Sequence, residues 1–317
     1  MKNKILLFIF SLSLLFTSCQ NVKKRNPENF KIDFSTKQQY KFTQVDNDIK
    51  MAYLDIGNKE NPTILLLHGE PNSSFVYRNI APLLVQQNYR VIIPDLVGFG
   101  YSDKPTDSTL ITYSNQTKWL QKFIDNLKLK NIHLFAHDWG GMISLRIVAK
   151  NPELFHKVAV SYSYLFEGDE IIPKSFLGFV DYAKNEPSFS AGNIMDWGSN
   201  TKLSDSIKSK YDTAFKNKSD FISVRKFPSM IPLDKDDKEA IINRELNKKL
   251  NLFTKPFMTI WGNHDDLMWK GKDSILQKNI IGAKNRKHYI LESNHFIQED
   301  KPKELTQILI NFFKDDK

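Results

Sequence analysis

Cysteine is almost absent from this chain, which has one cysteine among 317 residues. That single cysteine, Cys19, excludes an internal disulfide framework and a cysteine-based zinc site. The chain also lacks histidine clusters with metal-ligand spacing and glycine-rich loops that bind phosphate, so we expect neither a metal nor an organic cofactor. Although the formal net charge is +9, the basic residues form no stripe interleaved with aromatic residues. We therefore expect a lysine-rich surface that contacts water, and no binding of nucleic acid.

Long hydrophobic runs are also scarce, and the one at residues 5–16 is too short to span a bilayer with ease. Lys2 and Lys4 precede this run, and the small residues Thr17 and Ser18 follow it. This is the layout of a secretory signal peptide. We predict a cleaved signal over residues 1–19, followed by a polar tether over residues 20–39.

The end of the signal, Leu15-Phe16-Thr17-Ser18-Cys19, resembles a bacterial lipobox. The resemblance implies cleavage before Cys19 and lipidation of its thiol, and several acyl chains on one residue anchor a protein stably. We thus expect a protein of the bacterial cell envelope, tethered by lipid at the periplasmic face of a membrane. An ordinary secretory signal with a chance cysteine is the alternative.

Short apolar runs alternate with helical patterns along most of the chain. The runs that we expect to be strands are residues 40–45, 51–56, 63–67, 90–93, 132–136, 157–160, 256–261 and 287–291. The helical patterns cover residues 73–87, 112–126, 142–149, 275–281 and 303–313. Their alternation predicts an α/β fold with a mostly parallel sheet and helices on both faces. The alternation stops over residues 167–249, which we interpret as a helical cap inserted between core segments 40–166 and 250–317.

The segment Phe135-Ala136-His137-Asp138-Trp139-Gly140-Gly141 joins an expected strand to an expected helix. Small residues around one exposed side chain are typical of a nucleophile elbow, whose usual pattern is G-x-S-x-G. Here the central residue is Asp138, and no G-x-S-x-G occurs, which disfavours serine esterase chemistry. A carboxylate is already anionic and can displace a leaving group from saturated carbon, which leaves an ester on the enzyme. The alternative is that Asp138 only caps the helix.

Two further polar residues follow expected strands in the carboxyl-terminal part of the chain. Asp265 comes after residues 256–261, and His295 comes after residues 287–291. The carboxyl ends of parallel strands share one edge of a sheet, so Asp138, Asp265 and His295 can meet there. His295 would activate water to attack the ester, and Asp265 would orient the imidazole. Asp266 is an alternative to Asp265.

The order nucleophile, acid, histidine matches the α/β-hydrolase arrangement. His68-Gly69-Glu70-Pro71, Asp95-Leu96-Val97-Gly98-Phe99-Gly100 and His137-Asp138-Trp139-Gly140-Gly141 resemble haloalkane dehalogenases. The similarity is greatest to the subfamily whose catalytic acid follows the penultimate strand, and Val224-Arg225-Lys226-Phe227-Pro228 resembles it too. The resemblance implies displacement of halide from a small apolar haloalkane, followed by hydrolysis with water.

This resemblance also implies roles for residues around the nucleophile. The backbone amides of Glu70 and Trp139 would form the oxyanion hole. The indole N–H of Trp139 would bind the departing halide, with a second donor from a cap tryptophan. The family's pattern places that tryptophan where this chain has Gly192, so Trp197 is our candidate, with cap packing as its alternative role.

Epoxide hydrolysis with the same triad is the alternative reaction. It needs acids to protonate the opening ring, and the candidates are Tyr162, Tyr164, Tyr182 and Tyr211, in or near the cap. Two tyrosine hydroxyls facing Asp138 would favour it. A lipoprotein that binds a ligand without catalysis is a third possibility, which the complete triad argues against. The sequence predicts neither the specific substrate nor the oligomeric state.

Overall fold

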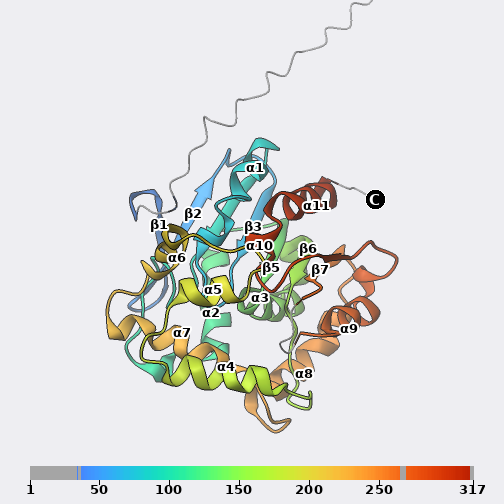
Figure 1. The fold of residues 1–317 in the computed structure, drawn as a ribbon. Coiled ribbons are helices and arrows are strands. Elements are labelled where there is room, and N and C mark those ends of the chain that lie inside the picture. The colour runs from blue at the N-terminus through green and yellow to red at the C-terminus, as the bar shows by residue number, and fades with distance from the viewer. Residues whose placement is uncertain (1–33, 35–36, 265–268, 315–317) are drawn as a thin grey trace, which may run out of the picture. The chain divides into compact units, whose positions relative to one another are not determined.

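The computed structural model describes residue 34 and residues 37–264 and 269–314 of the chain. In this part, eight strands form one sheet in the order β1-β2-β4-β3-β5-β6-β7-β8 (Figure 1). β1 pairs antiparallel with β2, and β2 pairs antiparallel with β4, whereas the other neighbours are parallel. The strand bounds are β1 Lys41–Asp46, β2 Ile49–Ile56, β3 Thr63–Leu67, β4 Arg90–Pro94, β5 Ile132–His137, β6 Phe155–Ser161, β7 Phe257–Gly262 and β8 Tyr289–Leu291.

Helices cover both faces of this sheet, as the sequence predicts. α1 packs on α11, while α2, α3 and α8 pack in a row, and α9 packs on β7. The helix bounds are α1 Ala81–Gln86, α2 Tyr113–Asn126, α3 Trp139–Lys150, α4 Lys174–Asn185, α5 Ala191–Trp197, α6 Asp205–Asp212, α7 Ile222–Lys226, α8 Lys238–Asn251, α9 Lys272–Asn279, α10 Ile297–Asp300 and α11 Pro302–Lys314. None of the described helices is long and apolar enough to cross a membrane.

The central strands are buried along nearly their whole length. Every residue of β5 is buried, and β3 is buried from Ile64 to Leu67. A parallel strand covered by helices on both faces must be apolar on both faces, which explains the continuous apolar runs in the sequence. Because β3 and β5 pair directly, the residues that follow them, His68 and Asp138, leave the sheet side by side at its carboxyl edge.

The helical pattern over residues 73–87 is interrupted in the structure. A short 3₁₀ helix, η3, covers Ser74–Tyr77, and α1 begins only at Ala81. Pro82 lies in the first turn of α1, where its missing N–H is harmless. Inside a continuous helix its ring would collide with the carbonyl of Arg78, so the helix has to restart.

A helical segment separates β6 from β7, as expected for an inserted cap. Within it α4 packs on α7 and α5 packs on α6, and Figure 1 follows the chain through these helices from green-yellow to orange. The last helix of the segment, α8, packs on α3, because Glu239 and Asn243 bind the guanidinium of Arg146 at 2.6 and 2.7 Å. The cap bounds given above stay a prediction.

The predicted signal peptide and the lipidation site Cys19 lie outside the described residues, as does most of the predicted tether. The described end of the tether is packed against the fold. Phe34 is buried, and its carbonyl oxygen accepts a hydrogen bond from the Tyr40 hydroxyl at 3.3 Å. Residues Lys37–Gln39 form a turn of 3₁₀ helix just before β1.

Candidate active site

Asp138 lies at the turn between β5 and α3 with a strained backbone. Its φ of 53° and ψ of −128° fall where residues other than glycine seldom occur. The turn is held from both sides, because the Asp138 N–H donates to Ser161 O at 3.0 Å and the Asp138 carbonyl accepts from Met142 N at 2.9 Å. The Asp138 side chain makes no capping hydrogen bond to α3. The interpretation of this residue as a helix cap is therefore wrong.

Three glycines permit the close packing of this turn. A Cβ at Gly69 would collide with the Asp138 carboxyl, and a Cβ at Gly140 would collide with the His68 carbonyl. A Cβ at Gly141 would overlap the Ser163 hydroxyl. The small residues of the two motifs thus bring the loop after β3 against the nucleophile turn.

The Asp138 carboxylate is oriented by groups on both of its oxygens. The backbone N–H of Glu70 donates to Oδ1 at 2.9 Å. Trp139 is the first residue of α3, where a helix N–H has no intrahelical acceptor and the helix dipole favours negative charge. The second oxygen, Oδ2, lies 3.8 Å from Nε2 of His295. The two predicted oxyanion donors and the nucleophile therefore meet at the start of α3.

His295 lies in the loop between β8 and α10, and its ring sits in an aromatic setting. The ring centroids of Tyr162 and Phe296 lie 4.7 and 4.8 Å from that of His295. The separation of 3.8 Å from Asp138 is too long for a direct hydrogen bond, and a water molecule beside the pair can contact both groups.

His137 supports the backbone of this loop. Its Nε2–H donates to the carbonyl of His295 at 3.0 Å, and its Nδ1 is buried without a partner among the described residues. Burial, and then the nearby His295, hold the pKa of His137 well below its usual 6.5. The neutral His137 thus fixes the position of His295 without adding charge to the site.

The predicted acid Asp265 and its alternative Asp266 lie outside the described residues. The loop that leads to them is bonded to the histidine loop. Asn263 N donates to Leu291 O at 3.0 Å, and His264 N donates to Ser293 O at 3.1 Å. The last described residue before Asp265 therefore runs alongside the segment that carries His295.

These side chains line a cavity of about 290 Å³ between the sheet edge and the helical insertion. Asp138, Trp139 and His295 lie on the sheet side. The insertion contributes an apolar wall that includes Phe176, Phe179, Ile194, Pro228 and Ile231. Such a cavity fits a small apolar molecule whose reacting carbon is held beside a carboxylate.

Trp197 also lines the cavity, but its side chain is 60% exposed and its ring packs near that of Tyr182 at 5.4 Å. Gly192, at the position expected to carry tryptophan, is buried. A Cβ there would collide with the backbone carbonyl of Lys208, so this position cannot carry a side chain unless α6 moves.

Sequence reasoning missed several polar residues of the cavity wall, namely His264, Trp269 and Asn294. Trp269 lies in the loop after β7, with its ring centroid 6.3 Å from that of His295. Its position, a few residues beyond an expected strand end, is the signal that could have identified it. Glu70 itself is among the residues that line the cavity, although only its amide was expected to act.

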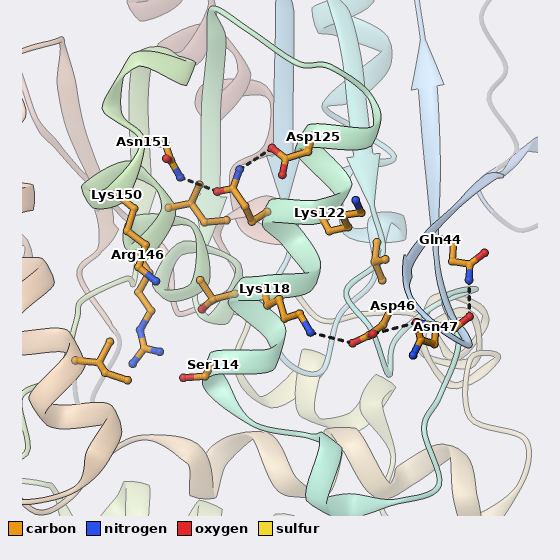
Figure 2. A pocket seen from close by; sticks show the side chains of 15 residues that line it. Gln44, Asp46, Asn47, Ser114, Lys118, Lys122, Asp125, Arg146, Lys150 and Asn151 are labelled. Carbon is orange, nitrogen blue, oxygen red and sulfur yellow. Dashed lines mark hydrogen bonds and ion pairs between the residues drawn. The ribbon is translucent and has the colours of Figure 1, made fainter.

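A larger hollow, of about 840 Å³, lies away from this site, between the β1–β2 turn, α2 and α3 (Figure 2). Several of its polar side chains are paired with one another. Lys118 lies 3.5 Å from Asp46, Gln121 donates to Asp125 at 2.9 Å, and Asn151 donates to Gln121 at 2.8 Å. We therefore place the chemistry in the smaller cavity, because the strained aspartate and the histidine lie there.

Comparisons with known proteins agree with this geometry. Residues 62–302 match the family model of the alpha/beta hydrolase fold. A haloalkane dehalogenase of Psychrobacter cryohalolentis is 38% identical over 271 residues, which cover 85% of this chain and 89% of that protein. One of Mycobacterium marinum is 35% identical, over 83% of this chain and 89% of that protein.

A solved structure gives the same result for the fold. The tetrameric haloalkane dehalogenase DpaA from Paraglaciecola agarilytica NO2 superposes with a TM-score of 0.80 at 26% identity. The match covers 89% of this chain and 95% of that one. With its elbow aspartate, its sheet order and these relatives, the chain belongs to the haloalkane dehalogenase family of the α/β hydrolases.

Proposed function

We propose that this protein hydrolyses haloalkanes, with Asp138 as the nucleophile. The observation that carries the proposal is the state of the Asp138 carboxylate. One of its oxygens is bound by the Glu70 N–H, and the other faces His295 in a small apolar cavity. A carboxylate in such a setting is oriented for attack on carbon and is shielded from bulk water.

In the first step Oδ2 of Asp138 attacks the carbon that bears the halogen. The new C–O bond forms as the carbon–halogen bond breaks, and the halide leaves with the bonding electron pair. The product is an alkyl ester of Asp138. The indole N–H of Trp139, which has no acceptor among the described residues, is available to bind the halide.

In the second step His295 accepts a proton from water as the water oxygen attacks Cγ of the ester. The negative charge that develops on Oδ1 is stabilised by the N–H of Glu70, which already binds that oxygen, and by the N–H of Trp139. On collapse the bond between Cγ and the alkyl oxygen breaks, and the protonated His295 gives its proton to that oxygen, so that the alcohol leaves. The carboxylic acid left on Asp138 then loses its proton to water, which restores the carboxylate. We propose that Asp265 orients the His295 ring and stabilises its positive charge in this step.

The test is a comparison of bromide release and diol formation by the purified protein, given a panel of bromoalkanes and terminal epoxides. We expect bromide release that disappears in Asp138→Ala. Diol without bromide would assign epoxide hydrolysis instead, and neither product would contradict both reactions.

No described tyrosine favours the epoxide reaction. Tyr162, Tyr164, Tyr182 and Tyr211 are not among the residues that line the cavity. The Tyr162 hydroxyl accepts from Gly262 N at 2.7 Å and donates to Asn294 O at 3.2 Å, and Tyr211 is bonded to Glu299 and Arg78. These hydroxyls are engaged in holding loops together.

We also propose that the mature protein is anchored to a membrane through lipid on Cys19, at the periplasmic face. The support is the sequence of residues 1–19 alone. Metabolic labelling with an alkyne fatty acid should mark the wild-type protein and not Cys19→Ser. Equal labelling of both, or of neither, would contradict the anchor.

A further inference from the structure

The two loops that would act together in ester hydrolysis follow strands that are not neighbours. Glu70, whose N–H would stabilise the developing charge, follows β3, and His295 comes after β8. Three strands, β5, β6 and β7, lie between β3 and β8 in the sheet. Since adjacent strands lie about 4.8 Å apart, the ends of β3 and β8 are separated by about 19 Å. The chain has to bring the two loops together across this distance.

A buried ion pair joins the two loops outside the cavity. α10 begins two residues after His295 and packs on η3, and Arg78 is the residue that follows η3. Both Nη atoms of Arg78 donate to the Glu299 carboxylate of α10, at 2.6 and 2.7 Å. The Glu299 side chain is 3% exposed, and its backbone N–H donates to Phe296 O at 2.9 Å. The pair therefore fixes the turn that follows His295 to the segment that follows Glu70.

The helical insertion reaches the same carboxylate through Tyr211, in the last turn of α6. The Tyr211 hydroxyl donates to Glu299 and accepts from Arg78 Nη1 at 3.2 Å. Burial, and then the charge of Glu299, raise the pKa of Tyr211 well above its usual 10, so the hydroxyl keeps its proton. The Tyr211 ring packs edge-on against Phe75 of η3, with ring centroids 5.1 Å apart. One buried carboxylate thus joins the insertion and both loops.

Stability alone is a weak reason to place an ion pair here. The cost of removing both charges from water offsets much of their attraction, and an apolar pair of similar volume is often equally stable. What a bidentate guanidinium adds is direction, because it fixes both the distance and the angle of its carboxylate. Catalysis is sensitive to such geometry, since a displacement of about 1 Å can slow a step about a hundredfold.

We propose that Glu299 is a positioning residue for hydrolysis of the ester, and that it acts with Arg78 by setting His295 at the right distance from the Glu70 N–H. This inference rests on the proposed dehalogenation and concerns only its second step. Ester formation does not use His295 as a base, so loosening the pair should leave that step nearly unchanged. Hydrolysis needs the base and the oxyanion donor in place at the same time, so it should slow.

The experiment compares the full chain with Glu299→Gln and Glu239→Gln, using the bromoalkane that the wild type turns over fastest. Glu239 is the matched control, because it binds Arg146 at the same 2.6 Å in a pair that joins α8 to α3 and not the two loops. In a rapid-quench experiment the burst of bromide reports ester formation. Intact-protein mass spectrometry of the quenched samples follows the loss of the alkyl group, which reports hydrolysis.

We expect hydrolysis to slow about tenfold to a hundredfold in Glu299→Gln, while the bromide burst stays within about threefold of wild type. Both rates should stay within about threefold of wild type in Glu239→Gln. A loss of packing alone would lower the thermal midpoint of either variant without this selective effect on the second step.

The double variant Arg78→Met/Glu299→Leu separates positioning from stability. Apolar side chains of similar volume can keep the thermal midpoint near that of the wild type, and we expect slow hydrolysis all the same. The proposal is overturned if this variant or Glu299→Gln hydrolyses the ester at the wild-type rate. Equal slowing of both steps in Glu299→Gln, or equally slow hydrolysis in Glu239→Gln, would also overturn it. Should the double variant fail to fold, the two glutamine variants decide the question.

A failure of the proposed function has a different signature. If the wild type gives no bromide burst with any bromoalkane, the dehalogenation is wrong, and the positioning of its second step is wrong with it. If the wild type forms and hydrolyses the ester, and Glu299→Gln does both at the same rates, only the role of Glu299 is wrong.

Discussion

The catalytic cavity and the larger hollow beside α2 differ in how their polar side chains are paired. The hollow, at about 840 Å³, is nearly three times the size of the 290 Å³ cavity. Among the described residues, no side chain that lines the hollow has a buried polar atom without a partner. At the edge of the sheet that borders the cavity, several do, namely Glu70, Asn72, His137, Ser161 and Ser293.

The difference follows from what each region has to do. Folding favours the pairing of every buried polar group, because an unpaired one costs about 1–3 kcal/mol. Unpaired groups and a strained aspartate persist at the sheet edge because the surrounding backbone fixes them there. In this molecule the strained aspartate beside a histidine, and not the volume of a hollow, marks the place where a ligand is expected.

The largest effect should come from His295, on the catalytic side. In His295→Phe we expect ester formation without hydrolysis, so steady-state bromide release falls about a thousandfold while one bromide per enzyme is still released. Intact-protein mass spectrometry should show the added alkyl group. The double variant Asp138→Ala/His295→Phe is the control, and an adduct on it would place the ester on another residue.

The pH dependence of stability should come in part from the catalytic side, beside a contribution from His133 near the start of β5, whose pKa burial lowers to about 4. His68 is buried and neutral, with Nε2 accepting from Leu96 N at 2.9 Å and Nδ1–H donating to Gly69 O at 2.8 Å. Burial lowers the pKa of both His68 and His137 below 6.5 in the folded protein. The unfolded chain binds protons first as the pH falls, so their contribution is complete above pH 6.5 and is lost below it.

We expect the free energy of unfolding to fall by about 1.4 kcal/mol per pH unit for each of these histidines between pH 6.5 and their folded values. Urea denaturation at pH 7, 6 and 5 measures this slope. Asp46 at the hollow is the matched control, because the hydrogen bond from Trp119 lowers its pKa from 3.8 and it stays ionised over this range. Asp46→Asn should leave the slope unchanged, and a flat profile in the wild type would contradict the assignment.

Two tryptophans give a matched pair across the regions. The Trp119 indole donates to Asp46 at the hollow at 3.0 Å, whereas the Trp139 indole has no acceptor among the described residues. We expect Trp139→Phe to weaken bromide binding about tenfold, because a donor to a charged ligand is lost. Trp119→Phe should lower the free energy of unfolding by about 1 kcal/mol and leave turnover unchanged. The opposite pattern would move the halide site to the hollow.

The smallest effects should come from the rim of the hollow. Asp125→Asn and Lys150→Ala change exposed side chains that Figure 2 shows at its border. We expect each to alter stability by less than about 0.5 kcal/mol and turnover by less than about twofold. A larger loss of turnover in a steady-state bromide assay would show that the hollow takes part in function.

Local patterns were sufficient to predict most of the sheet and the nucleophile turn. The strand over residues 63–67 has the predicted bounds, and the other expected strands are displaced by a few residues at most. The nucleophile elbow could be predicted because its small residues and Asp138 are neighbours in sequence. The positions of Asp138 and His295 on one cavity follow from the shared edge of parallel strands. The roles of Asp265 and Cys19 stay predictions, because both lie outside the described residues.

Features that depend on contacts distant in sequence could not be predicted. In the sequence, Gly192 is only a departure from the tryptophan that the family's pattern predicts. The structure gives the reason, because the Lys208 carbonyl occupies the place that a Cβ at this position would need. The raised pKa of Glu70 depends on its burial and on Asp138, which is 68 residues away. The start of a new helix at Ala81 could have been predicted, because Pro82 forbids a continuous helix there. The apolar periodicity of residues 73–87 obscured this signal.

The insertion is bonded to the histidine loop at the end of α5. Phe296 N donates to Gly198 O at 3.0 Å, and Asp300 accepts from the backbone N–H groups of Asn200 and Asn294, at 3.0 and 2.9 Å. Anyone who redesigns the substrate range of this scaffold should therefore leave the end of α5 intact, since changes there would displace His295, the proposed general base. Phe176 and Phe179 on α4 reach the same cavity without these bonds, and they are the positions at which selectivity can be altered independently of catalysis.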